Sequence, residues 1–280
     1  MSRTNMRICH VTTAHSADDV RIFERECKSL AEITEYDVYL AATGTLPESK
    51  DIHFISLGSQ GKHRMSRLLR APARSLCFAH LTRFDIWHFH DPELLPAALD
   101  LAVRGQCVIW DAHEDYPNQF ERHGAKDWIP EPIRGVLGMG LQFLLKSIDQ
   151  RAQAIIAATP GIASSYRNPN TVIVGNEARI EDFTRCDPSP TSKRILFTGS
   201  LTSNHCFPEV VEAIRALPEL TLAVAGRRPP EQTWTSAKLQ LGERIIHLGW
   251  LNRSDLADAI ESSLLGLVTY KGTSAYMDEQ

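Results

Sequence analysis

Histidine and carboxylate side chains gather at two places in this sequence, and each place follows an apolar run. The two clusters comprise His88, His90, Asp91 and Glu93, and then His113, Glu114 and Asp115. Imidazole and carboxylate groups can transfer protons, bind sugar hydroxyl groups or coordinate a metal ion. Which of these is open to the clusters depends on the elements that carry them.

Residues 85–90 and 107–113 have the composition of buried strands, and the segment between them carries helix signals. Asp91 stands at the N-cap position, Pro92 at the first helical position and Gly105 just after the last one. Parallel strands joined by a helix end at the same edge of a sheet, and open α/β sheets bind their ligands at that edge. The two clusters are therefore expected to converge there.

A metal site is one interpretation of His88 and His90, because H-x-H pairs occur in zinc sites. No cysteine ligand lies beside them, so we expect no metal. We assign the two histidines to orienting an acceptor or to supporting His113. Asp91 has a second interpretation, as a helix cap alone.

The loop at residues 15–19 leads from the first predicted strand, residues 6–13, into a helix predicted over residues 20–33. A helix N-terminus can bind phosphate. This loop, however, has no glycine, and it carries Asp18 and Asp19, which would repel an anion. We predict that these aspartates cap the helix or bind sugar hydroxyl groups.

The composition is that of an ordinary globular protein. The chain has 280 residues, 43% hydrophobic and 23% charged, enough for two modest α/β domains or one large one. A net charge of −4 and a pI near 6.3 argue against nucleic-acid binding. The six cysteines are scattered without a C-x-x-C pair, which predicts reduced thiols in a cytoplasmic protein. No signal peptide and no apolar run of about 18 residues is found, so no transmembrane helix is expected.

The domain organisation follows from a loss of periodicity over residues 177–193. We place an N-terminal Rossmann-like domain at residues 1–182, a linker at 183–193 and a C-terminal Rossmann-like domain at 194–280. The second β-α series stops shortly after its fourth predicted strand, at residues 265–270. We therefore expect the second domain to be incomplete and the chain to be truncated.

A basic amphipathic stretch covers residues 61–79. Its charged positions are Arg64, Arg67, Arg70 and Arg74. They indicate either a solvated helix face or peripheral contact with anionic lipid headgroups. Pro72 is predicted to kink or split this helix. A second long helix is predicted over residues 130–151. Its apolar residues are expected to pack in the core, and a groove for a lipid acceptor is the alternative interpretation.

Several segments together resemble glycosyltransferase family 4. They are DDVRIFERECKSLAE, DIWHFHDPELLP, VIWDAHEDYP, AIIAATPGIA, VIVGN, ILFTGSL, LAVAG and IIHLGWL followed by LLGLVTY. HFHDPELLP together with DAHEDYP is similar to bacterial polysaccharide-assembly members. The resemblance implies an α/β, GT-B-like fold, with two Rossmann-like domains facing across a cleft. It also implies a retaining, metal-independent reaction, with the acceptor held by the N-terminal domain and the nucleotide-diphosphate sugar by the C-terminal one.

The resemblance also assigns roles to single residues. His113 matches the family histidine that contacts the donor sugar near the reacting centre, and it is the predicted catalytic residue. The predicted acceptor-side residues are Asp19, Arg21, His88, His90, Asp91, Glu93, Glu114 and Asp115. The predicted donor-binding residues are Gly199, Ser200, His205, Gly226 and Arg227. The sequence departs from the family in two ways: His205-Cys206 stands where Arg-Gly or Lys-Gly is usual, and the glutamate pair expected beyond Tyr270 is not found.

The function implied by this resemblance is the transfer of a sugar from a UDP- or GDP-linked donor, without a cofactor. The acceptor would be an oligosaccharide or a lipid-linked glycan in bacterial surface-polysaccharide synthesis, at the inner face of the cell membrane. The two departures support a second interpretation, a non-catalytic relative or accessory subunit that binds acceptor or a partner enzyme. A sugar-nucleotide epimerase of the same architecture is a third.

Overall fold

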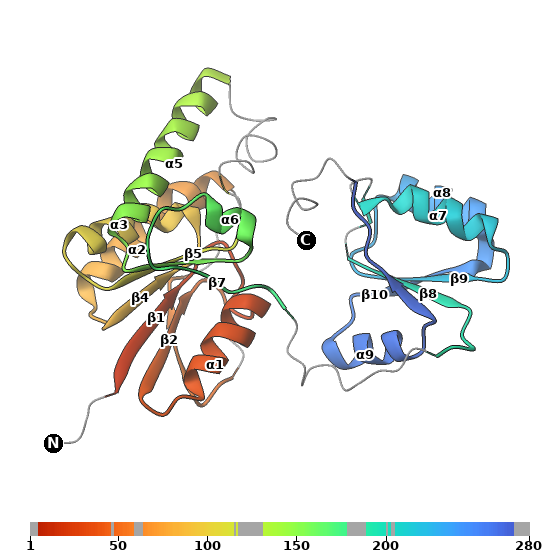
Figure 1. Ribbon diagram of the computed structural model, residues 1–280, viewed down its shortest axis with the longest axis horizontal. Helices are drawn as coiled ribbons and strands as arrows, with labels where there is room; N and C mark the ends of the chain where they lie inside the picture. Colours follow the sequence, from red (N-terminus) through yellow and green to blue (C-terminus); the bar gives the residue numbers. More distant parts are fainter. Residues whose placement is uncertain are drawn as a thin grey trace. The chain divides into compact units, whose positions relative to one another are not determined.

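Two parallel β-sheets organise the chain, one in each of two compact units (Figure 1). The computed structural model describes residues 5–45, 48–58, 64–114, 116, 131–177, 189–199, 201–202 and 205–271, with only the backbone described for residues 64–72 and 131–134. Unit 1 is Met1–Asn176 and unit 2 is Glu177–Gln280. The predicted end of the first domain, at residue 182, lies outside the described residues.

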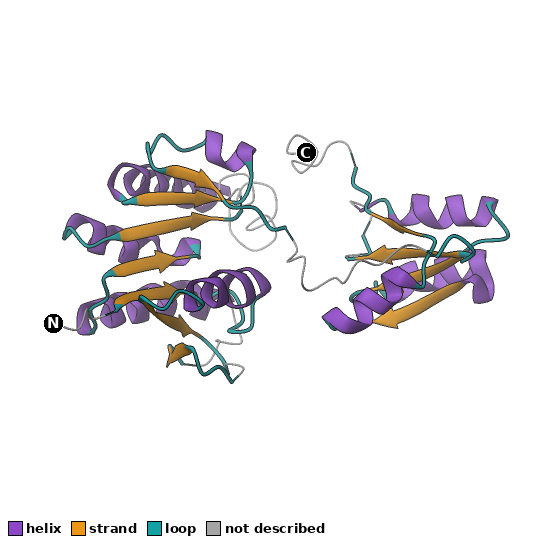
Figure 2. Ribbon diagram, turned by 60° about the horizontal axis from the view of Figure 1, so that its bottom comes forward, coloured by secondary structure: helices purple, strands orange, loops and turns teal. Residues whose placement is uncertain are grey.

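Unit 1 contains a seven-stranded sheet in the order β3-β2-β1-β4-β5-β6-β7, with every pair parallel. Its strands are β1 (Met6–Val11), β2 (Tyr36–Ala42), β3 (Ile52–Ser56), β4 (Ile86–Phe89), β5 (Val108–Ala112), β6 (Ala154–Ala157) and β7 (Thr171–Ile173). Its helices are η1 (Val20–Cys27), α1 (Lys28–Ala31), α2 (Arg64–Leu81), η2 (Pro92–Leu94), α3 (Leu95–Val103), α5 (Glu131–Arg151) and α6 (Pro160–Ser164). The helices cover both faces of the sheet (Figure 2).

The strand order reverses between β1 and β4, which makes their carboxyl ends a topological switch point. His10 on β1 is directly paired in register with His88 on β4, and Phe89 is paired with Trp110 on β5. Side chains at paired positions of neighbouring strands lie on the same face of the sheet. The sheet therefore brings the histidines of two strands together.

The helix predicted over residues 20–33 begins where expected but has a different geometry. The Asp19 carboxylate accepts hydrogen bonds from the backbone N–H groups of Arg21 and Ile22, at 2.9 and 3.1 Å, which confirms its capping role. From Val20 to Cys27 the helix is of the π type, and only α1 is α-helical. In an α-helix, residues five apart point about 140° away from each other, whereas the i→i+5 register of a π-helix places Arg21 and Glu26 on the same side.

The two long helices of unit 1, α5 and α2, agree with their predictions only in part. Leu145 and Ile148 of α5 are buried in the core as predicted, but Val136 and Leu137, in the preceding part of α5, are exposed. Helix α2 runs unbroken through Pro72, so the predicted split there is wrong, while a kink at this residue stays a prediction. The side chains of Arg64, Arg67 and Arg70 lie outside the described residues, and Arg74 donates to the carbonyl of Leu57 at 3.3 Å.

Among the described helices, none combines the length and the apolar character needed to cross a bilayer.

Unit 2 contains a four-stranded parallel sheet in the order β10-β9-β8-β11. Its elements are β8 (Arg194–Thr198), α7 (Phe207–Ala216), β9 (Thr221–Ala225), α8 (Glu231–Leu241), η6 (Gly242–Arg244), β10 (Ile245–Gly249), α9 (Arg253–Glu261) and β11 (Leu265–Leu267). Phe197, Val224 and Trp234 pack on one face, whereas Ala223 and Ala259 pack on the other. The alternating strand-and-helix series predicted for this half is therefore confirmed, with helices on both faces of its sheet.

Candidate functional site

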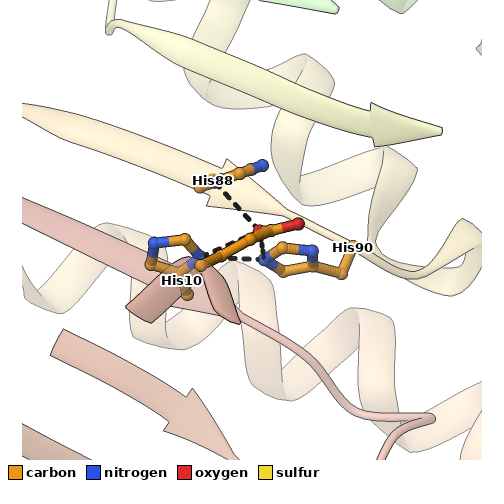
Figure 3. Close-up of side chains that lie close together, drawn as sticks. His10, His88 and His90 are labelled. Atoms are coloured by element: carbon orange, nitrogen blue, oxygen red, sulfur yellow. Dashed lines mark hydrogen bonds and ion pairs between the residues drawn. The ribbon is translucent and has the colours of Figure 1, made fainter. Parts of the chain in front are cut away.

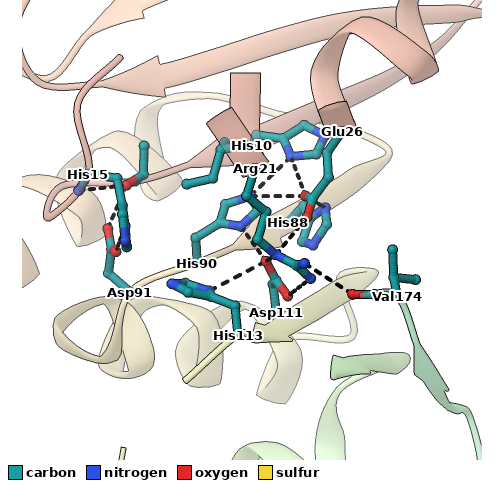
Figure 4. A network of polar contacts seen from close by, with 12 residues as sticks. His10, His15, Arg21, Glu26, His88, His90, Asp91, Asp111, His113 and Val174 are labelled. Carbon is teal, nitrogen blue, oxygen red and sulfur yellow. Dashed lines mark hydrogen bonds and ion pairs between the residues drawn. The ribbon is translucent and has the colours of Figure 1, made fainter. Parts of the chain in front are cut away.

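The polar clusters of unit 1 meet at the carboxyl ends of β1, β4 and β5 (Figure 4). His88 is the third residue of β4, His90 and Asp91 follow that strand, and His113 follows β5. The structure thus brings the two sequence clusters to one sheet edge, as expected from the βαβ arrangement. It also adds side chains from the loop after β1 and from η1 that the sequence clusters did not contain.

At the centre of this network, Asp111 and Arg21 form a buried ion pair. Arg21 donates from Nη2 to Asp111 Oδ1 at 2.8 Å and from Nε to Oδ2 at 3.0 Å. Its Nη1 donates to the Val174 carbonyl at 3.0 Å and to Asn176 Oδ1 at 2.9 Å. Burial would raise the pKa of Asp111, but hydrogen bonds from His113, His90 and Arg21 hold it well below its usual range. Asp111 is therefore a fixed negative charge.

His113 lies beside this ion pair. Its Nδ1 is 3.5 Å from Asp111 Oδ2, and its ring nitrogens lie 3.5 and 3.4 Å from the hydroxyl of Tyr116. The ring of His15 contacts it edge-on, with centroids 4.9 Å apart. An aspartate beside Nδ1 favours a proton on that nitrogen and leaves Nε2 as an acceptor.

Asp91 stands at the N-cap position of η2 as predicted, but its side chain makes no capping hydrogen bond, so the interpretation of its carboxylate as a helix cap is wrong. Its carboxylate instead organises the loop after β1, accepting from the Thr12 hydroxyl, from the backbone N–H groups of Thr13 and Ala14, and from His15 Nδ1 at 2.7 Å. Burial would raise the pKa of Asp91, but the contacts with His15 and the backbone lower it to about 2. Burial would lower the pKa of His15, but the hydrogen bond and charge of Asp91 raise it to about 9. The pair is ionised at neutral pH.

A cavity of about 320 Å³ opens above this network. It is lined by His15, Asp19, Val20, Arg21, Ile22, Arg25, His113 and Asn176. His88, His90, Asp91 and Glu93 are buried and do not line it. These four residues therefore do not line this cavity, and their acceptor-side roles stay predictions.

A second cavity of about 480 Å³ lies between α5 and α6. Its lining includes Glu114, Gln142, Lys146 and Tyr166. Glu114, predicted at the acceptor side, therefore belongs to this cavity and not to the first. Asp115 lies outside the described residues.

The corresponding sheet edge in unit 2 consists mainly of backbone. Gly199 follows β8 and donates its N–H to the Ala225 carbonyl at 3.0 Å, while Gly226 follows β9 and donates to Gly249 at 2.8 Å. Both amide N–H groups are thus paired within the sheet, and the donor-binding roles of Gly199 and Gly226 stay predictions. Arg227 is exposed, and Ser200 lies outside the described residues.

His205 is half-buried and contacts other residues of unit 2. Its Nδ1 is 2.8 Å from the Thr202 hydroxyl, its carbonyl accepts from the Thr269 hydroxyl at 2.6 Å, and its ring packs against Tyr270. Cys206 follows in the left-handed region, with φ 51°. This is the position where the family resemblance places glycine.

Sequence reasoning missed several residues of the unit 1 network, namely His10, His15, Glu26, Tyr116 and Asn176. The parallel pairing of β1 with β4 could have revealed His10, because it places that residue beside His88. Glu26 gave no such signal, since an α-helical period does not turn it toward Arg21. Asn176 is far from the other residues in the sequence and reaches the site only through the end of the sheet.

Comparison with known proteins identifies the fold. No family model matches the chain, and no curated protein matches it in sequence. Among solved structures, the sucrose-phosphate synthase of Thermosynechococcus elongatus superposes with a TM-score of 0.72 at 13% identity, over 94% of this chain and 75% of its own. WaaG, a glycosyltransferase involved in lipopolysaccharide biosynthesis, superposes with a TM-score of 0.66 at 12% sequence identity. The match covers 94% of this chain and 75% of the WaaG chain.

This is a GT-B-like fold. A UDP-GlcNAc 2-epimerase from Neisseria meningitidis, solved with UDP-GlcNAc bound, is also similar, with a TM-score of 0.57 at 11% identity over 93% of this chain and 76% of its own. The predicted α/β fold class with parallel sheets is therefore confirmed. Transferases and epimerases share this fold, so the reaction has to be argued from the site itself.

Proposed function

We propose that this protein is a retaining glycosyltransferase that moves a sugar from a UDP- or GDP-linked donor to a hydroxyl group of a glycan acceptor. The observation that carries the proposal is the position of His113 at the cavity, with Asp111 beside its Nδ1 and Arg21 locking Asp111. An orienting carboxylate leaves the outer nitrogen of the imidazole able to accept a hydrogen bond from a sugar hydroxyl. The GT-B-like fold and the switch-point location support the same assignment.

In this proposal, each residue of the cavity has its own role. His113 contacts the donor sugar near the anomeric carbon, while Arg21 and Asp111 position it without touching the sugar's reacting atoms. Arg25 and His15 also line the cavity, and both can carry positive charge beside the negative charge that builds on the leaving diphosphate. Arg227 and His205 would supply the donor contacts of unit 2. Neutralisation by such groups would need no metal ion at the diphosphate.

The acceptor is proposed to be a lipid-linked or oligosaccharide glycan of bacterial surface-polysaccharide synthesis, reached at the inner membrane face. The support is an apolar face of α5, on which Val136, Met139 and Phe143 are 63, 65 and 69% exposed. The basic positions of α2, including Arg74, add cationic charge for anionic headgroups. Vesicle sedimentation tests this part, and unchanged binding after Val136→Ser, Met139→Ser and Phe143→Ser together would contradict it.

The test of the reaction is incubation of the full chain with a panel of UDP- and GDP-sugars, followed by separation of free nucleotide, transferred sugar and epimerised nucleotide sugar. We expect release of nucleoside diphosphate with acceptor present and a loss of about 10²–10³-fold in kcat for His113→Ala. His80→Ala, at an exposed position of α2, is the matched control.

Each other outcome selects another function. Epimerised donor without transfer would assign the epimerase reaction, for which the fold match to UDP-GlcNAc 2-epimerase is the supporting observation. Calorimetry that detects acceptor binding but no nucleotide-sugar binding would assign the non-catalytic, accessory role. Full activity of His113→Ala would remove His113 from the site.

A further inference from the structure

We propose that unit 1 holds a divalent transition-metal ion of the zinc class in its core, coordinated by His10, Glu26, His88 and His90. The proposal goes beyond the transfer reaction and does not depend on it. The four residues come from β1, η1, β4 and the residue just after β4. Their potential ligand atoms all lie within 4.8 Å of one another.

The distances match a tetrahedral site. Figure 3 shows the three histidine rings converging on one point. His10 Nδ1 lies 3.0 Å from His90 Nε2, and Glu26 Oε2 lies 3.7 Å from His10 Nδ1, 3.9 Å from His88 Nδ1 and 3.9 Å from His90 Nε2. Ligand atoms about 2.0–2.1 Å from a tetrahedral zinc ion lie about 3.4 Å apart. The four distances given above differ from this value by about 0.3–0.5 Å, and the remaining pairs of ligand atoms lie within 4.8 Å of each other.

The fold makes this grouping in two independent ways. The parallel register sets His10 beside His88, and the period of two along a strand directs His90 to the same side as His88. The π-helical register of η1 then turns Glu26 toward them together with Arg21. Local π-helical turns are frequent at functional sites, because they re-aim a side chain at small cost to the rest of the helix.

Burial supplies the energetic argument. His10, His88 and His90 are buried, and Glu26 is nearly so, with 11% of its side chain exposed. Both Glu26 carboxylate oxygens have no hydrogen-bond partner among the described residues, although Oε1 lies 3.1 Å from Arg21 Nε. Polar groups in a dry core cost free energy unless they are paired. A bound cation would pair the buried Glu26 carboxylate and would be coordinated by His10 Nδ1, His88 Nδ1 and His90 Nε2, the ring nitrogens that face it.

The surroundings of His90 have the form found around metal-bound histidines. Its Nδ1 lies 2.9 Å from Asp111 Oδ2, which leaves Nε2 facing the cluster as a lone pair. A carboxylate behind a ligating imidazole fixes its tautomer and raises its basicity. Asp111 thus links the cluster to His113, so that an ion at the cluster would stiffen the wall of the cavity. Four protein ligands leave no open coordination position, which assigns the ion a structural role.

The test begins with the metal content of the full chain. After purification from zinc-supplemented cells, we expect one equivalent of zinc per chain. After exchange into Co²⁺, we expect the intense visible absorption of a tetrahedral site. Chelator treatment should lower the thermal midpoint of unfolding, because the ion binds the folded state only. Substoichiometric metal in the folded wild-type protein, together with no cobalt spectrum, would overturn the proposal without any variant.

Variants then locate the ion. Glu26→Gln and His88→Asn should weaken zinc binding by more than about 100-fold, and Asp111→Asn by about 10–100-fold. The exposed His80→Ala should bind as the wild type does, and circular dichroism checks that each variant is folded. His90, Asp111 and His113 form a second possible cluster. Loss of zinc in His113→Ala with retention in His88→Asn would place the ion there and overturn the proposed ligand set.

Discussion

The carboxyl edges of the two sheets have the same parallel topology but use different chemistry. In unit 1 the edge is built from side chains: the Arg21–Asp111 pair, the His15–Asp91 pair and three buried histidines, one on β1, one on β4 and one just after β4. In unit 2 it is built from backbone, with Gly199 and Gly226 packed against each other. The difference shows where each unit is sensitive: unit 1 to the loss of a charge, and unit 2 to the addition of a carbon atom.

The largest effect is expected from Asp111→Asn. This change leaves the Arg21 guanidinium buried without its bidentate partner, and breaking a buried ion pair on one side costs about 3–5 kcal/mol. We expect unit 1 to lose stability by this amount in urea denaturation followed by circular dichroism. Asp100 also pairs with an arginine, Arg104, but on the surface. Asp100→Asn is therefore the matched control and should change stability little. Equal effects of the two changes would contradict the view that buried charges hold this edge together.

The counterpart in unit 2 is Gly226→Ala. Gly226 has φ 136°, and a Cβ there would collide with the carbonyl oxygen of Gly199. Backbone strain of about 1–3 kcal/mol and overpacking of about 1–3 kcal/mol both oppose the change. Gly199 has φ 115° but open space around its Cβ position. Gly199→Ala should therefore show the strain alone, and thermal unfolding of the two variants isolates the collision. If both variants unfold at the same temperature, close backbone approach is not what requires glycine here.

The sequence carried enough information for the architecture of both edges. Apolar runs, caps and glycines located the strands and helices, because these elements obey local periods. The βαβ spacing also predicted that His88, His90, Asp91 and His113 would share one sheet edge, since parallel crossovers leave no other choice.

The roles within the edge were less accessible to sequence. Burial depends on every element packed around a residue, so the sequence did not show that His88 and His90 are buried and do not line the cavity. Asp91 looked like a helix cap because its neighbours fit that pattern. In the structure its carboxylate instead accepts hydrogen bonds from backbone N–H groups of the loop after β1. The position of Glu26 could not be predicted, because η1 is a π-helix of only eight residues and its residue pattern does not reveal the π-helical period.

A smaller effect is expected from the protonation of His15. The folded state holds this proton with a pKa of about 9, above the value of 6.5 for a free histidine. The His15–Asp91 contact therefore stabilises the fold fully between about pH 4 and pH 6.5, where both groups are charged, and its contribution disappears as the pH rises toward 9. Thermal midpoints of the wild type should fall across this range, and those of His15→Gln should fall less. The exposed His53→Gln serves as the control. Parallel curves for the wild type and His15→Gln would show that His15 is not protonated in the folded state.

The smallest effect on stability is expected at Cys206. This residue has a positive φ, as several glycines of unit 2 do, but it carries a side chain. Among the described residues, Cys206 is the only one other than glycine with a positive φ, and it precedes α7 in the left-handed region. That conformation costs an L-residue about 1–2 kcal/mol, whereas glycine loses about 0.5–1 kcal/mol through its more flexible unfolded chain. Cys206→Gly should therefore raise the stability of unit 2 by up to about 1 kcal/mol in chemical denaturation. Cys206→Ala removes the sulfur but keeps the Cβ, so it should give no such gain. A gain of the same size from alanine would attribute the effect to the thiol and not to the backbone.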